Sequence, residues 1–292
     1  MALLDMLQSA AIELRMPSTF TSAIGNTDAH VKLLLALANA EIKESRRDYP
    51  WPQLIKAGTI TLSTGVSSYA LPGDFDSFVA DSEWNTSDTQ PLIGPISAQD
   101  WNALAYGITG VTTLKQYRLE GIADSQFFIY PTPTAADSGT ILAFRYKSSR
   151  CARPRMWASA TTFNGSTTAP AYCFYNGNYY CTTVGGTTGA TPPTHTSSTA
   201  SDGGITWTYY DGDYSSFTAD TDLVLFDQEM SKQGIKWRFQ AAHNFDFSIA
   251  RAAYDKAAKL AFARLAPSPK LRIDGSAGGF RLIDDQNIPD TI

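Results

Sequence analysis

Residues 157–210 read WASATTFNGSTTAPAYCFYNGNYYCTTVGGTTGATPPTHTSSTASDGGITWTYY. This stretch of 54 residues contains one formally charged side chain, Asp202, together with 14 threonines, two Gly-Gly pairs and many tyrosines. The rest of the chain is charged like an ordinary globular protein. A segment that lacks charge but keeps Tyr, Trp, Thr and Gly is typical of a small β module, not of a linker. We therefore expect an all-β module over residues 151–212, inserted into a host domain.

The centre of this module carries the strongest hairpin signal in the chain. Two tyrosine-rich runs, residues 172–175 and 179–182, flank Asn176-Gly177, a pair that type I′ turns prefer. Residues 205–209 alternate in polarity and are expected to form the closing strand.

The turn length decides how two cysteines of the hairpin are placed. A two-residue turn puts Cys173 and Cys181 on opposite faces, whereas a three-residue loop sets them opposite each other. A disulfide is the less favoured outcome. A zinc site is less favoured still, because only His195 lies nearby in the sequence.

The N-terminal flank has helical periodicity. Apolar residues at 4, 7, 11 and 14 predict a helix over residues 3–15. A second helix begins after Asn26 or Thr27, both competent N-caps, and Tyr49-Pro50-Trp51-Pro52 ends it. Its predicted apolar stripe is Val31, Leu34, Leu35, Ala38 and Ile42.

Between this helix and the module, apolar side chains recur at every second residue, as in β-strands. We expect a hairpin of residues 60–62 and 69–71 around Gly65, and a short helix opened by Ser97 and Asp100. Three strands are predicted at residues 115–120, 126–130 and 140–147. The segment therefore indicates an antiparallel β domain, either a small barrel or a sandwich.

Two further helices follow the module. Asp227 or a neighbour opens the first, in which Gly234 would let another helix approach closely. The second covers about residues 247–265, begins at a possible Asp246 cap and is rich in alanine, which has the highest helix propensity. The remaining tail keeps apolar side chains between turn formers, a pattern that favours docking onto a partner.

The predicted fold class is α+β: a helical-bundle host with an antiparallel β domain, an inserted all-β module and an extended C-terminal tail. The predicted boundaries are 1–56 for the N-terminal helices, 57–150 for the β domain, 151–212 for the module, 213–266 for the C-terminal helix pair and 267–292 for the tail.

The net charge, the pI and the number of cysteines narrow the classes of protein that fit this chain. A net charge of −5 and a pI near 5.2 argue against a general nucleic-acid binder. We expect no signal peptide and no membrane span, and three cysteines fit a reducing cytoplasm. The range from Lys232 to Arg281, however, contains ten basic residues and only three aspartates. A solvated helix face explains such a run, and a docking surface for an acidic partner is the alternative.

No catalytic or metal-binding motif emerges. His30, His195 and His243 lie far apart in the sequence. The run that starts at Asp211 begins like a calcium loop, but Ser216 occupies the glycine position and no glutamate follows at the twelfth. We therefore expect no cofactor and no metal, and an enzyme is the weakest hypothesis.

The aromatic side chains of the module allow two interpretations. They can supply the core that a small β module needs, or form a platform for sugar rings or a neighbouring protein. The core interpretation is favoured for the two tryptophans and for alternate tyrosines. The residues concerned are Trp157, Tyr172, Tyr175, Tyr179, Tyr180, Trp207 and Tyr209.

Three stretches outside the module carry a family resemblance through their order. They are residues 33–54 ending in Tyr49-Pro50-Trp51-Pro52-Gln53-Leu54, residues 117–131 from Tyr117-Arg118-Leu119-Glu120 to Phe127-Phe128-Ile129-Tyr130-Pro131, and residues 217–223 leading into the helix of Lys236-Trp237-Arg238. In this order they resemble the head-to-tail adaptors of short-tailed bacteriophages, also called tail tubular A-like or head-completion proteins. The module is similar to small β modules of phage tail and fibre proteins, some of which resemble carbohydrate-binding modules.

The resemblance implies a structural virion protein of the head–tail junction, made in the host cytoplasm. It implies a ring, usually of twelve copies, beneath the portal protein, with downstream tail or nozzle and fibre proteins as further partners. DNA would pass through the ring without sequence-specific binding. The tail would dock onto the portal through Leu271, Ile273, Phe280, Leu282, Ile283 and Ile288. The subunit-contact helices would use Lys232, Lys236, Trp237, Arg238, Arg251, Lys256, Lys259 and Arg264.

The alternative is a carbohydrate-binding or fibre-attachment protein that acts through the inserted module. A third hypothesis is an enzyme acting on cell wall or polysaccharide.

Overall fold

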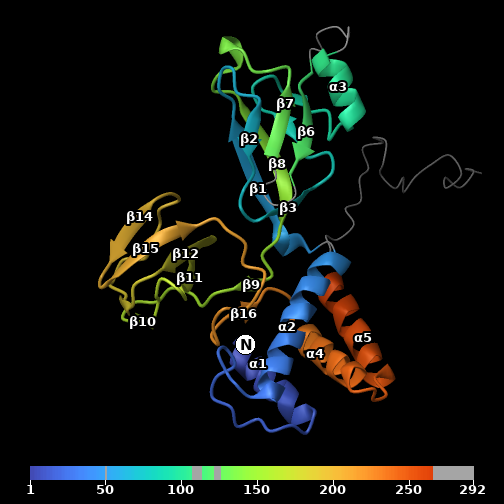
Figure 1. Ribbon diagram of the computed structural model, residues 1–292, viewed down its shortest axis with the longest axis vertical. Coiled ribbons are helices and arrows are strands. Elements are labelled where there is room, and N and C mark those ends of the chain that lie inside the picture. The colour runs from blue at the N-terminus through green and yellow to red at the C-terminus, as the bar shows by residue number, and fades with distance from the viewer. Residues whose placement is uncertain (50, 107–113, 122–125, 266–292) are drawn as a thin grey trace, which may run out of the picture.

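The computed structural model describes residues 1–49, 51–106, 114–121 and 126–265. Figure 1 shows three parts: a β domain at the top, a β module at the left and a helical bundle below them. The fold class is α+β with several antiparallel sheets, as predicted. The predicted tail, residues 267–292, lies outside the described residues.

Segments from both halves of the chain build the helical bundle. Its helices are α1 (Leu3–Glu13), α2 (Ala29–Asp48), α4 (Gln228–Ala242) and α5 (Ser248–Leu265). Helix α4 packs against the other three. The shared core includes Leu34 and Ile42 from α2 and Met230, Ile235 and Tyr254 from the C-terminal pair.

Aspartate side chains begin three of these helices. The carboxylate of Asp28 caps α2 by accepting from the backbone N–H of His30 at 2.8 Å. The predicted cap at Asn26 or Thr27 is therefore wrong, because Asn26 instead accepts from the Asp28 backbone N–H. Asp227 caps α4, as predicted, and Asp246 accepts from the Ser248 N–H at the start of α5.

Helices α2 and α4 approach closely at Gly234. A Cβ added there would lie 2.2 Å from the carboxylate of Glu41, so the prediction that Gly234 permits close helix packing is confirmed. The carboxylate of Glu41 accepts from Arg238 and from Ser45 Oγ, the latter at 2.7 Å. Glu41 is fully buried, and Arg238 also pairs with Glu44 at the edge of the bundle.

The β domain is a sandwich of two antiparallel sheets. One contains β1 (Ile55–Thr61), β3 (Phe75–Phe78), β4 (Trp84–Asn85), β5 (Gln90–Pro91) and β8 (Ile141–Ser148). The other contains β2 (Ser68–Ala70), β6 (Gln116–Glu120) and β7 (Gln126–Tyr130). Single turns of 3-10 helix, η1 (Pro52–Leu54) and η2 (Ala135–Asp137), precede β1 and β8. Leu142 and Phe144 of the first sheet share a core with Tyr117 and Phe127 of the second.

The predicted hairpin of residues 60–71 is wrong. Strand β1 pairs with β8, and β2 pairs with β7 in the other sheet, so the chain changes sheets near Gly65. Strands of a hairpin and strands facing each other across a sandwich both bury alternate side chains, so their polarity patterns are the same. The short helix is present as α3 (Ala98–Tyr106), where Ser97 Oγ accepts from the Asp100 N–H at 3.1 Å.

The module begins and ends at a two-stranded stem, in which β9 (Ala152–Arg153) pairs with β16 (Leu223–Val224). Beyond the stem a four-stranded sheet runs in the order β11 (Ala171–Tyr175), β12 (Asn178–Thr182), β15 (Ile205–Tyr210) and β14 (Thr199–Asp202). A short ribbon of β10 (Thr162–Phe163) and β13 (Gly186–Thr187) covers it.

The hairpin of the module has the two-residue turn. Tyr175 pairs with Asn178, and both Asn176 and Gly177 have positive φ, as a type I′ turn requires. Cys173 therefore pairs with Tyr180 and points to the opposite face from Cys181. Both cysteines are free.

Replacing Gly234 with Ala tests the close approach of α2 and α4. Alanine should favour the helix, but its methyl group would displace the buried Glu41 carboxylate from Arg238. We expect a net loss of about 2 kcal/mol in the free energy of unfolding, measured by chemical denaturation. The matched control is Gln233→Ala on the same helix, which should change stability by less than about 0.5 kcal/mol. Equal stability of the two variants would contradict the packing described.

Candidate assembly surfaces

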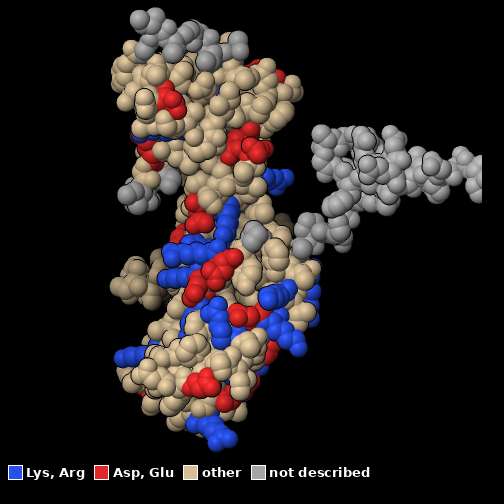
Figure 2. Space-filling model, turned by 90° about the vertical axis from the view of Figure 1, so that its right-hand side faces the viewer, with Lys and Arg blue, Asp and Glu red and all other residues tan. Residues whose placement is uncertain are grey.

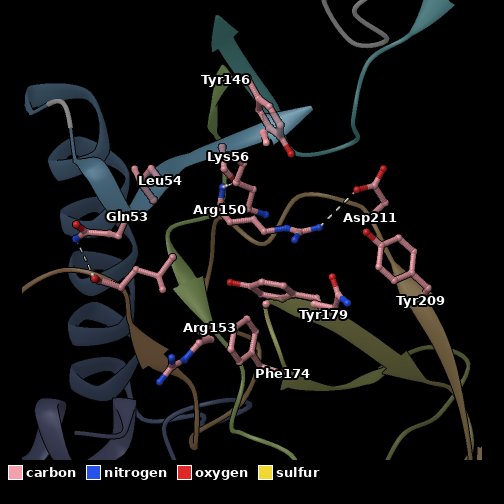
Figure 3. A pocket seen from close by; sticks show the side chains of 15 residues that line it. Gln53, Leu54, Lys56, Tyr146, Arg150, Arg153, Phe174, Tyr179, Tyr209 and Asp211 are labelled. Carbon is pink, nitrogen blue, oxygen red and sulfur yellow. Dashed lines mark hydrogen bonds and ion pairs between the residues drawn. The ribbon is translucent and has the colours of Figure 1, made fainter. Parts of the chain in front are cut away.

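A crevice of about 500 Å³ lies between the β domain and the module (Figure 3). Its walls come from β1, β8, the segment that joins β8 to β9, and the β11–β12 hairpin. The guanidinium of Arg150 lies between the β domain and the module, 4.2 Å from the centroid of the Tyr179 ring. The charged and aromatic side chains that line the crevice are Lys56, Tyr146, Arg150, Arg153, Phe174, Tyr179, Tyr209 and Asp211.

Buried Asp74 neutralises part of the positive charge of this crevice. Its carboxylate lies 2.6 Å from Lys56 Nζ and 3.5 Å from Arg150 Nε, and it also accepts from Tyr146 OH at 2.8 Å. Burial acts to raise the pKa of Asp74, but the charges of Arg150 and Lys56 outweigh it and hold the pKa below its ordinary value. Burial, reinforced by the Arg150 charge, lowers the pKa of Lys56.

Arg153 adds a cation without a counter-charge. Among the described residues it makes no ion pair; its guanidinium lies 5.1 Å from the centroid of the Phe174 ring. Its Nε atom is buried and lacks a hydrogen-bond partner. Asp211 is half-exposed and approaches Arg150 only at 4.0 Å. The crevice therefore holds more cationic than anionic groups.

Three of the predicted subunit-contact residues are held inside the subunit. Arg238 is buried against Glu41, and Lys232 and Lys236 reach Glu13 of α1 at 3.0 and 2.5 Å. The sequence could not show this, because Glu13 and Glu41 lie about 200 residues away from their partners. A role for these residues between subunits stays a prediction.

The other predicted contact residues lie towards the outside of the bundle. Trp237 is half-buried between the guanidinium groups of Arg238 and Arg251. Lys256 and Lys259 are exposed on α5, and Arg264 is 75% exposed. Figure 2 shows Lys and Arg side chains gathered over the middle of the molecule on the side where α5 lies, with fewer charges on the β domain above.

Helix α5 exposes apolar side chains as well as basic ones on its outward side. Ala250, Ala258 and Ala261 are buried, whereas Ile249 and Leu260 are 83% and 51% exposed. Phe245 and Phe247, in the turn before α5, are exposed too. Contiguous exposed apolar surface marks an interaction site more often than single exposed residues do. This surface was not predicted from the sequence, although the alanines on every side of the predicted helix were a signal of it.

The aromatic side chains of the module divide between its two faces. Trp207 and Tyr180 are fully buried in the core of the module. On the opposite face, Tyr179 and Tyr172 pack against Tyr214 and join the core of the bundle. The other predicted residues are half-buried: Trp157 and Tyr175, whose ring centroids are 5.8 Å apart, and Tyr209 in the crevice.

Asp202, the one formally charged residue of the stretch 157–210, is buried in the centre of the module. One carboxylate oxygen accepts from the indole N–H groups of Trp157 at 2.7 Å and Trp207 at 3.2 Å. The other accepts from the Gly189 backbone N–H at 2.7 Å. The carboxylate therefore orients both tryptophans of the module.

The model of one protein family, described as SU10 adaptor protein, matches residues 1–172, more than half of the chain. The chain belongs to the SU10 adaptor family. The match covers α1, α2 and the β domain and ends in β11, the first strand of the main sheet of the module. No curated protein matches the chain.

Membership of this family makes the protein a structural phage adaptor of the virion, which joins other virion proteins, and not an enzyme. The prediction of a phage head-to-tail adaptor is thereby confirmed. Among the described residues, no group of three potential ligands could hold a metal ion. No described helix combines the length and hydrophobicity needed to span a membrane.

The predicted portal-docking residues of the adaptor, Leu271, Ile273, Phe280, Leu282, Ile283 and Ile288, lie outside the described residues. Their role stays a prediction.

Asp202→Asn tests the centre of the module. The amide keeps one acceptor but places an NH₂ group against N–H donors, so a buried donor loses its partner. We expect the module to lose about 2 kcal/mol of stability, visible in thermal unfolding followed by tryptophan fluorescence. The control is Asp255→Asn, which removes an exposed pair with Arg251 and should have little effect. An unchanged melting curve for Asp202→Asn would refute the assigned role.

Proposed function

We propose that this adaptor forms a ring beneath the portal protein, where it prolongs the DNA channel and provides a platform for the tail. The observation that carries the proposal is membership of a phage adaptor family. A part that joins a head to a tail around DNA must close around an axis, and closed rings use contacts between two different surfaces of each subunit.

The outward face of α5 supplies one of these surfaces. Ile249 and Leu260 lie exposed on it, and its alanines let a neighbouring helix approach closely. Lys256, which lies between Ile249 and Leu260 on the same face, and Lys259 would set the register against the next subunit. The copy number of twelve is the one that related adaptors suggest.

The C-terminal tail supplies the attachment to the portal. Its apolar residues are separated by glycines and other turn formers, so each tail would make only a few weak contacts. Many tails around one ring would act together, and the combined contact would be far stronger than a single one.

DNA passes through such a ring without sequence-specific binding. The chain carries a net charge of −5. Three basic side chains of α4 are held by Glu13 and Glu41 within the subunit. A lining that is not strongly basic lets DNA slide, because few phosphates are held.

Deleting residues 275–292 tests the attachment to the portal. We expect the truncated adaptor to keep its circular dichroism spectrum but to lose attachment to purified portal rings, measured by co-sedimentation and electron microscopy. Replacing Phe280, Ile283 and Ile288 together by Ser should have the same effect, because it removes the apolar contacts. The matched control is Ser276→Ala with Thr291→Ala. Normal attachment of the truncated chain would show that the tail is not the anchor.

Ile249→Asp combined with Leu260→Asp tests the contact between subunits. Each buried aliphatic side chain contributes about 2 kcal/mol, so the double variant should assemble at least 100-fold more weakly. Mass photometry and electron microscopy would show monomers where the parent forms rings. The control is Val184→Asp, at an exposed position of the module. Rings of normal size from the double variant would exclude this face of α5 from the contact.

A further inference from the structure

The crevice between the β domain and the module holds more cationic than anionic groups. Lys56 and Arg150 share buried Asp74, and Arg153 has no ion pair among the described residues. Aromatic rings of Phe174 and Tyr179 lie beside these cations (Figure 3). Such a site fits an extended segment that carries carboxylates next to apolar side chains.

A second groove leads from the end of α5 to this crevice. It has a volume of about 320 Å³, and Leu265, the last described residue, lines it together with Phe226 and Ala261. Gln53 and Leu225 line both the groove and the crevice, so the two hollows adjoin. The chain therefore leaves α5 at the entrance of a path to the cationic site.

The end of the tail has the chemistry that the crevice lacks. After Arg281 it contains three aspartates, Asp284, Asp285 and Asp290, and no basic residue. Leu282 and Ile283 precede the first two aspartates directly, and Ile288 precedes the third by two positions. Ile283 lies 18 positions after Leu265 in the sequence. Extended, they span up to about 60 Å, far more than two adjoining hollows require.

We propose that residues 282–290 occupy the crevice of their own subunit before the adaptor meets its partner. The carboxylates of Asp284 and Asp285 pair with Arg153 and Lys56, and the neighbouring apolar side chains lie against Phe174 and Tyr179. The crevice thus holds the tail on the surface of the subunit until another virion protein offers a stronger site. This inference goes beyond attachment to the portal, because the stored position involves no second protein.

Photo-crosslinking of the full-length chain tests the proposal. Ile288 is replaced by p-benzoylphenylalanine, the purified protein is irradiated without portal protein, and the crosslinked peptides are identified by mass spectrometry. We expect crosslinks to residues 53–57 or 174–179. Their yield should be independent of protein concentration, because the contact lies within one subunit.

Variants that change charge show whether the tail binds the crevice specifically or touches it at random. Arg153→Glu should reduce the yield about tenfold, because it replaces an attraction by a repulsion, and Asp284→Asn with Asp285→Asn should reduce it without altering the body of the protein. Adding Asp284→Arg alone to the Arg153→Glu chain should restore the yield, because the new pair is attractive and Asp285 still pairs with Lys56. The matched control, Arg145→Glu, changes an exposed arginine of β8 that does not line the crevice.

Crosslinks scattered over other surfaces, or a yield that the tail variants leave unchanged, would overturn the proposal. A yield that falls on dilution would overturn it as well, since it would assign the crevice to the tail of another copy. None of these outcomes bears on attachment to the portal, which the deletion of residues 275–292 tests separately.

Discussion

The buried ion pair between Glu41 and Arg238 joins the two ends of the fold. These residues lie 197 positions apart in the sequence, on α2 and α4. Either charge left buried without the other would be strongly destabilising, so the bundle is stable only when both segments meet in one register. Gly234 is part of the same constraint, because any larger residue would occupy the space of the Glu41 carboxylate. The β domain and the module are therefore excursions from a helical frame that closes around this pair.

The helical bundle, the module and the junction between the module and the β domain use their charged side chains in different ways. In the bundle, Lys232, Lys236 and Arg238 pair with acidic side chains of the same subunit. On α5, by contrast, Lys256 and Lys259 are exposed together with Ile249 and Leu260. In the core of the module, the buried carboxylate of Asp202 orients two indoles. At the junction, Arg150 contacts both neighbours: it pairs with Asp74 of the β domain and stacks on Tyr179 of the module. This arginine is the main polar link between the two.

Local signals predicted most of the elements. Helical spacing gave the four bundle helices, Asn176-Gly177 gave the hairpin, and Asp227 and Ser97 marked helix starts. Pairing between distant strands was not predictable, because β1 would show the same alternation whether its partner were β2 or β8. The crevice was equally hidden, since Lys56, Arg150 and Tyr179 come together only after the chain has folded. Glu41 as the partner of Arg238 was hidden for the same reason, and a basic run alone does not show which of its charges face solvent.

The stem of the module has a further consequence. The backbone N–H of Cys151 donates to the carbonyl of Tyr214 at 3.1 Å, so the chain departs and returns at almost the same point. Such an insertion can be gained, lost or exchanged in evolution with little disturbance of the frame around it. Recombination between phage genomes can thus give related adaptors different modules while the helical frame is inherited unchanged.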